Sequence, residues 1–181
     1  MLSREKEEKI SKFLSYVLRH CPEDIGLELD ENGWVSVHEL IEKAKSKHIL
    51  TKDVIEFVVK NNKKQRFALS EDKRQIRANQ GHTVEVNLDL AFVEPPEVLF
   101  HGTATRFLDS ILAQGLKAMS RHDVHLSLNR AVATQVGERH GKVIVLEILA
   151  KQMYEDGYKF QCSTNNVWLT KEVPAKYIRQ T

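Results

Sequence analysis

The chain has 181 residues, a formal net charge of +2 and 41% hydrophobic residues. This length can bury a sizeable core in one domain or in two small lobes. No apolar run approaches the ~20 residues that a membrane-spanning helix needs, and the charged N-terminus precedes no apolar signal core. These patterns argue against a membrane-spanning or secreted protein, and we expect a soluble, cytoplasmic chain with no membrane partner.

The cysteines and histidines form no metal-binding pattern. Cys21 and Cys162 are far apart in the sequence, which fits an intracellular protein with reduced thiols. His122 and His125 are three positions apart, but no other Cys or His near them completes a zinc pattern. We therefore expect no metal site.

The chain begins with a predicted amphipathic helix. Apolar residues recur at helical spacing between Ile10 and Leu18, so the helix should run from about Arg4 to before Pro22. Arg19 and His20 then lie on its last turn. Cationic side chains at a helix C-terminus can also serve only to stabilise the helix, and that alternative stays open on this segment alone.

Two hairpins and two short helices are predicted next. The first hairpin should turn at Asn32–Gly33, between strands within 27–37. Helices are expected over about 37–47 and 52–60, the second capped by Thr51. Residues 66–77 predict another hairpin that turns at 70–73. Helices followed by a basic hairpin indicate a compact winged-helix-like lobe that ends between 78 and 90, although fold alone does not establish function.

A basic stripe overlaps the second hairpin. Between 60 and 77 the sequence has seven basic residues and only two acidic ones. The basic residues are Lys60, Lys63, Lys64, Arg66, Lys73, Arg74 and Arg77. A surface for nucleic-acid phosphates and a solvated lysine-rich surface both explain such a stripe.

The pattern changes after Glu94–Glu97, where two prolines interrupt regular structure and suggest a domain boundary. Strands and helices alternate beyond it, which predicts a strand-rich second lobe of α+β type. The expected strands are 98–102, 124–128, 143–149, 159–163 and 167–170, and the expected helices are 105–114 and 129–139, with a helical turn near Met153.

Two similar triplets end strands of this second lobe. His101-Gly102-Thr103 closes an apolar run, and His125-Leu126-Ser127 follows the next predicted helix. Glycine permits close approach of a ligand to the backbone, and the histidine and hydroxyl are donors that orient a sugar or an amide. The two edges could meet in one cleft. The plainer alternative is a strand that runs into a helix capped by Thr105.

Eight motifs together resemble those of the NAD-dependent RNA 2'-phosphotransferases, the KptA-like tRNA 2'-phosphotransferase family. They occur in family order over nearly the whole chain, although each is weak by itself. The motifs are Leu18-Arg19-His20, Asn32-Gly33-Trp34-Val35, Lys64-Gln65-Arg66-Phe67, Arg77-Ala78-Asn79-Gln80-Gly81-His82, His101-Gly102-Thr103, His125-Leu126-Ser127, Val136-Gly137-Glu138-Arg139-His140-Gly141 and Asn166-Val167-Trp168-Leu169-Thr170.

The resemblance implies an α+β enzyme with a winged-helix RNA-binding lobe at 1–90 and an ADP-ribosyltransferase-like NAD-binding lobe at 91–181. Such an enzyme removes an internal 2'-monophosphate from RNA in two steps. The RNA 2'-phosphate displaces nicotinamide from NAD and becomes ADP-ribosylated, and the ribose 2''-hydroxyl then attacks the phosphorus. The products are a free RNA 2'-hydroxyl and ADP-ribose 1'',2''-cyclic phosphate.

The resemblance also assigns a catalytic set, Arg19, His20, Arg66 and Arg121. Arginines suit this role because planar guanidinium groups bind a phosphate dianion and stabilise its transition-state charge. His20 can hydrogen-bond the phosphate or pass a proton between hydroxyls. Without the other motifs, Arg66 reads as one more solvated charge and Arg121 as an ordinary loop arginine.

Further positions are assigned to ligands. His101, Gly102, Thr103, His125 and Ser127 resemble the edge that binds the nicotinamide half of NAD. The RNA substrate is expected at Gln80, Gly81 and His82, for which a turn with a surface histidine is the alternative.

One position departs from related ADP-ribosyltransferases. Val167 stands where they often have a glutamate, and an anionic phosphate acceptor needs no such base. Arg139 and His140 end a helix and are left out of the catalytic set, and Arg130 is treated as a surface residue.

Two other functions stay open on the sequence. An ADP-ribosyltransferase that modifies phosphorylated nucleic-acid ends would stop after the first step, and an RNA-binding module would use the basic lobe without catalysis. The expected partners are 2'-phosphorylated RNA and NAD, used as a co-substrate without a metal, and we expect a monomer. A link to tRNA splicing or other RNA processing is not fixed by the sequence.

Overall fold

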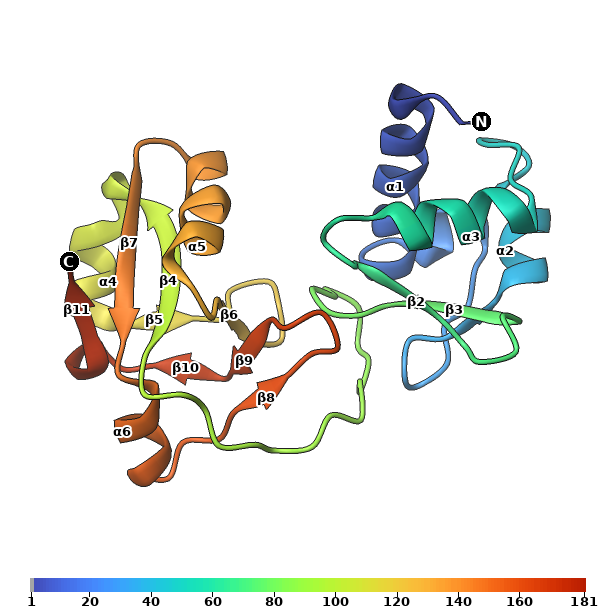
Figure 1. Ribbon diagram of the computed structural model, residues 1–181. Helices are drawn as coiled ribbons and strands as arrows, with labels where there is room; N and C mark the ends of the chain where they lie inside the picture. The colour runs from blue at the N-terminus through green and yellow to red at the C-terminus, as the bar shows by residue number, and fades with distance from the viewer. Residues whose placement is uncertain (1) are drawn as a thin grey trace. The chain divides into compact units, whose positions relative to one another are not determined.

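The computed structural model describes residues 2–181, which fall into two compact units. One unit ends at Asp89 and the other is Leu90–Thr181 (Figure 1). The proline-containing segment Glu94–Glu97 therefore lies inside the second unit, where Val93 N donates to Phe160 O and Lys151 N to Glu97 O. Among the described residues, no helix is long and apolar enough to cross a membrane.

The helices of the first unit confirm the sequence pattern. α1 is Arg4–Arg19, and the Ser3 hydroxyl caps it by accepting from Lys6 N. α2 (Val37–Ala44) and α3 (Lys52–Asn61) follow a short 3-10 helix, η1 (Pro22–Ile25), and Thr51 caps α3 as predicted. Their apolar faces form one core that includes Leu14, Leu18, Leu40 and Ile55.

A three-stranded antiparallel sheet completes the first unit. β1 (Val35–Ser36), β2 (Phe67–Leu69) and β3 (Gln75–Ala78) have the order β1-β3-β2. The register of β2 and β3 pairs Phe67 with Ala78 and Leu69 with Ile76, so the hairpin predicted over 66–77 is confirmed.

The hairpin predicted at Asn32–Gly33 is correct in its turn and wrong in its first strand. The Asp30 carboxylate accepts from Asn32 N at 2.9 Å and from Trp34 N at 2.8 Å, which closes a tight loop. Beyond the turn Val35 pairs with Ile76 of β3, and residues 27–30 form no strand. The alternating pattern there reflects loop residues that pack on the core, as Leu27 does.

The second unit is built from three small antiparallel sheets. β11-β7-β4 is the main one, with α5 beside β4 and β7 (Figure 1), and the others are β6-β9-β8 and β10-β5. Since every strand pairing in the described residues is antiparallel, the mixed helix and sheet content fits the expected α+β class. Its elements are β4 (Leu99–Ala104), η2 (Thr105–Phe107), α4 (Leu108–Gln114), β5 (Leu116–Lys117), β6 (Val124–Leu126), α5 (Arg130–Gly137), η3 (Glu138–His140), β7 (Val143–Ile148), α6 (Ala150–Glu155), β8 (Gln161–Cys162), β9 (Trp168–Thr170), β10 (Glu172–Val173), η4 (Ala175–Tyr177) and β11 (Ile178–Gln180).

Two expectations for the second unit are corrected. The helix predicted over 105–114 begins as a 3-10 turn, and Thr105 caps nothing, because α4 starts at Leu108 without a side-chain cap. Three short strands, β5, β10 and β11, were not predicted. Each has only two or three residues, too few to show the alternation that marks a strand.

Candidate functional site

The two His-containing triplets meet in the second unit. Phe100 and Ser127 exchange backbone hydrogen bonds of 2.9 and 2.8 Å, which joins the first part of β4 to the residue after β6. His101 Nδ1 lies 3.0 Å from the carbonyl oxygen of His125. The two triplets therefore adjoin in the structure, but the prediction that His101–Thr103 ends a strand is wrong, because β4 continues to Ala104.

His101 is held in one tautomer. A carbonyl oxygen only accepts, so Nδ1 carries the hydrogen and Nε2 of the neutral ring has the free lone pair. Burial lowers the pKa of His101 below 6.5, the His125 carbonyl opposes this shift, and His140 adds to it. The ring is therefore a neutral hydrogen-bond acceptor at neutral pH.

Gly102 also has a packing reason to be glycine, besides the close approach of a ligand that the sequence predicts. A Cβ added there would lie 1.7 Å from the carbonyl oxygen of Ala133 and 3.0 Å from Gly137 N, both backbone atoms of α5. The absence of a side chain thus lets α5 pack closely on β4. Gly137 faces the same contact, since its added Cβ would lie 3.0 Å from Gly102 C.

A cavity of about 220 Å³ opens beside this edge. It is lined by four of the expected residues and by one from the catalytic set: His101, Gly102, Thr103, His125 and Arg121. Ser127 does not line it and contributes its backbone to the bridge with Phe100.

Several lining residues were not expected. His140, which the sequence analysis left out, lines the cavity with Phe107, Lys117 and Asp123. The motif 136–141 carried a signal for His140, whereas Phe107 belonged to a predicted helix with no sign of a ligand and Lys117 lies on the two-residue β5. Asp123 is ion-paired with Lys171 at 2.8 Å.

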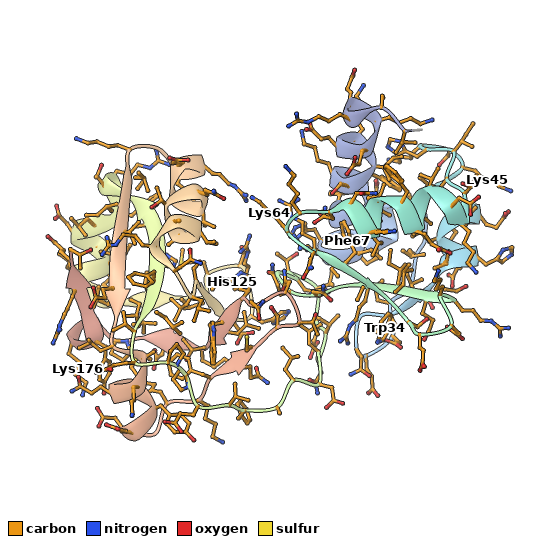
Figure 2. The ribbon with its side chains drawn as sticks, viewed as in Figure 1. Trp34, Lys45, Lys64, Phe67, His125 and Lys176 are labelled. Carbon is orange, nitrogen blue, oxygen red and sulfur yellow. The ribbon has the colours of Figure 1, made fainter. Side chains whose placement is uncertain are left out.

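Arg121 contacts the edge directly. Its Nη1 donates to Nδ1 of His125 at 3.0 Å. Because a guanidinium group only donates, the lone pair of His125 is on Nδ1 and the hydrogen of the neutral ring is on Nε2. Figure 2 labels His125, and this pairing places a cation among the cavity's polar groups.

Arg19 and His20 lie at the end of α1 in the first unit, as predicted. The Arg19 carbonyl oxygen accepts from Thr83 N at 2.9 Å and Val84 N at 3.3 Å. His20 Nδ1 lies 3.0 Å from the Thr83 hydroxyl. A segment remote in sequence therefore fixes the end of this helix.

Arg66 directly precedes β2, between Lys64 and Phe67, both of which Figure 2 labels. Its backbone N–H donates to Asn62 Oδ1 and its carbonyl oxygen accepts from Asn79 N, while Asn79 Nδ2 donates to Gln65 O at 2.6 Å. Burial lowers the pKa of Arg66. Within residues 2–181 Arg66 forms no ion pair, so this is a partly buried cation without a carboxylate.

The basic stripe is divided by its ion pairs. At the tip of the β2–β3 hairpin, Lys73 pairs with Glu56 at 2.8 Å and Arg74 approaches Asp72 at 3.9 Å. Arg77 lies over the Trp34 ring at 4.7 Å, and burial lowers its pKa. The positive charge available to an anion therefore lies toward Arg66 rather than at the hairpin tip.

The three positions expected to bind RNA, Gln80, Gly81 and His82, lie in the first unit. Gly81 and His82 are buried in the first unit and Gln80 is partly buried. A Cβ added to Gly33 would lie 3.3 Å from His82 Nε2, so His82 packs against the Asn32–Gly33 turn. Their role toward RNA stays a prediction.

Val167 lies in the β8–β9 turn. Its N–H donates to Ser163 Oγ, and its carbonyl oxygen accepts from Ser163 N. Searched over the described residues, the structure has no group of three His, Cys, Asp or Glu that could hold a metal.

An arginine without a carboxylate and an arginine in a polar cavity are both groups that can bind a phosphate. Residues 5–172 match the family described as "RNA 2'-phosphotransferase, Tpt1 / KptA family", and the chain belongs to that family. A "Probable RNA 2'-phosphotransferase" of Acaryochloris marina is 57% identical over 93% of both chains. Proteins of the same name are 56% identical in Flavobacterium johnsoniae, over 93% of both chains, and 52% identical in Pseudomonas fluorescens, over 98% of this chain and 99% of that one.

Proposed function

We propose that this protein removes an internal 2'-monophosphate from RNA by transferring it to NAD, a reaction that releases nicotinamide and ADP-ribose 1'',2''-cyclic phosphate. The family supports the RNA 2'-phosphate, and the observation that carries the NAD assignment is the cavity lined by His101, Thr103, His125 and Arg121. In this proposal the first unit is a winged-helix RNA-binding lobe and the second an ADP-ribosyltransferase-like lobe.

NAD acts here as a co-substrate whose anomeric carbon accepts the RNA 2'-phosphate oxygen as the bond to nicotinamide breaks. Neutral His101 offers Nε2 as an acceptor, which suits a ribose hydroxyl or an amide N–H of NAD. Arg121 supplies positive charge in the same cavity. Because the phosphate is already an anion, this attack needs no general base, which agrees with a valine at position 167.

The first-unit residues are proposed to act on the phosphate. Arg66 is partly buried and has no ion pair in the described chain, so a phosphate would neutralise a cation that the fold leaves uncompensated. Arg19 is proposed to bind the same dianion from the end of α1. Guanidinium groups preorganised in this way stabilise charge that grows on the phosphate oxygens in the second step.

His20 is proposed to handle the proton of that second step. The 2''-hydroxyl forms a bond to phosphorus while the bond from phosphorus to the RNA 2'-oxygen breaks. One hydroxyl loses a proton and the other gains one, so a single histidine can take it and return it.

The decisive experiment incubates a 2'-phosphorylated oligonucleotide with the protein, with and without NAD, beside the same oligonucleotide without the phosphate. We expect NAD-dependent loss of the phosphate and formation of ADP-ribose cyclic phosphate. A persistent ADP-ribosylated RNA would indicate an enzyme that stops after the first step. Binding of RNA without any NAD-dependent reaction would refute the proposal and favour an RNA-binding module.

A further inference from the structure

The end of α1 is capped by backbone from far along the chain. The last carbonyl groups of a helix have no partner within the helix. Thr83 N and Val84 N supply partners for Arg19 O, at 2.9 and 3.3 Å. This contact fixes the backbone from which the His20 side chain projects.

The Thr83 side chain adds a second contact, directly to the imidazole. Its Oγ1 lies 3.0 Å from His20 Nδ1 and 3.4 Å from Arg19 O. A hydroxyl can donate one hydrogen bond and accept others. It can therefore accept from a protonated Nδ1 while its own hydrogen turns to Arg19 O, or donate to Nδ1 when that nitrogen has the lone pair.

The same contact thus suits both protonation states of the ring. A group that takes up and returns a proton passes through both states, and Thr83 can bond to Nδ1 in each of them, as an acceptor when Nδ1 carries a hydrogen and as a donor when it has the lone pair. The contact engages Nδ1, on the side of the ring that Thr83 approaches. Nε2 is therefore the nitrogen that this partner does not engage.

We propose that Thr83 is a positioning residue for His20, orienting the imidazole for the phosphate-transfer step. The proposal rests on the proposed function, because His20 has its catalytic role only there. Thr83 is exposed and belongs to no apolar cluster, so its hydroxyl has little to contribute to the stability of the core.

The test replaces Thr83 by residues that separate hydroxyl from shape. Thr83→Val has nearly the same shape and keeps the backbone N–H that caps α1. We expect kcat for phosphate removal to fall roughly tenfold, the factor that corresponds to one ordinary hydrogen bond. KM for both substrates and the melting temperature should be unchanged. Thr83→Ser should restore kcat, and Thr105→Val, the same change at another exposed threonine, should leave it at the wild-type value.

Two further measurements show whether Thr83 acts through His20. In a His20→Ala background under single-turnover conditions, Thr83→Val should cause no additional loss. The nitrogen NMR resonances of the His20 ring give a readout that needs no activity, and Thr83→Val should shift the Nδ1 resonance whereas Thr83→Ser should not.

An unchanged kcat in Thr83→Val, an unchanged Nδ1 resonance, or an equal loss in the His20→Ala background would overturn the proposal. A wild-type protein that removes no phosphate, but whose Nδ1 resonance shifts in Thr83→Val, would refute the proposed function and leave the contact established.

Discussion

Replacement of Gly102 by alanine tests whether this glycine serves packing or ligand approach. The added Cβ would lie 1.7 Å from Ala133 O and 2.6 Å from Ala133 C. Ordinary contact begins at 3.4 Å, so α5 would have to move away from β4 by about 1.7 Å. Both obstructing atoms belong to the backbone of a helix, and no side-chain rotation can relieve the overlap.

The expected cost is large for a single methyl group. Overpacking in a core typically costs about 1–3 kcal/mol, and a clash with helix backbone belongs at the upper end. A loss of about 3 kcal/mol lowers the melting temperature of a unit of this size by about 12–24 °C. Gly137→Ala should cost less, about 1–2 kcal/mol, because its nearest backbone obstruction, Thr103 N, is 2.9 Å away and the closer Cγ2 of Val143, at 2.5 Å, belongs to a side chain.

Unfolding of the second unit can be followed by itself. The chain has two tryptophans, Trp34 and Trp168, so a Trp34→Phe background leaves a single reporter in the second unit. Urea titrations of that background with and without each glycine change give the two free energies of unfolding. If Gly102→Ala cost less than Gly137→Ala, or less than about 1 kcal/mol, the packing argument would be refuted and ligand approach would be the better explanation.

Three other outcomes are expected. Arg66→Met should leave the free energy of unfolding unchanged or higher, yet weaken binding of a 2'-phosphorylated oligonucleotide by roughly tenfold or more; equal binding by anisotropy would contradict this. NMR titration should give His101 a pKa below 6.5. The contribution of this ring to the free energy of unfolding is therefore fully present above pH 6.5. It declines as the pH falls below 6.5, because the unfolded chain then binds a proton that the folded ring does not. His20→Ala should leave the NAD affinity measured by calorimetry near the wild-type value. Arg121→Ala should weaken it, because Arg121 donates to His125 in the cavity. An unchanged NAD affinity in Arg121→Ala would count against the proposal that this cavity binds NAD.

Local patterns were sufficient for the parts of the fold that local interactions determine. The helical spacing from Ile10 to Leu18 and the cap at Thr51 predicted α1 and α3 nearly to the residue. The two His triplets were interpreted as edges that could meet, and the contact of His101 Nδ1 with the His125 carbonyl oxygen shows that they adjoin.

The features that sequence reasoning missed depend on distant partners. Thr83 and His20 are separated by 63 positions, and nothing in either segment signals the other. Asn79, which holds the backbone of Gln65 and Arg66, likewise appeared only as part of a motif. For Gly102 the residue was singled out but its cause was not, because the carbonyl that excludes a side chain belongs to a helix whose docking position no local pattern reveals.

The close packing at Gly102 also bears on the cavity. Successive residues of a strand point to opposite faces, so Gly102 meets α5 on one face while His101 and Thr103 occupy the other. Val136 on α5 and His140 on η3 line the same cavity as His101. A side chain at position 102 would displace α5, and the cavity wall would move with it. Replacement of Gly102 should therefore weaken ligand binding by moving Val136 with α5, even though the new methyl group points at the helix.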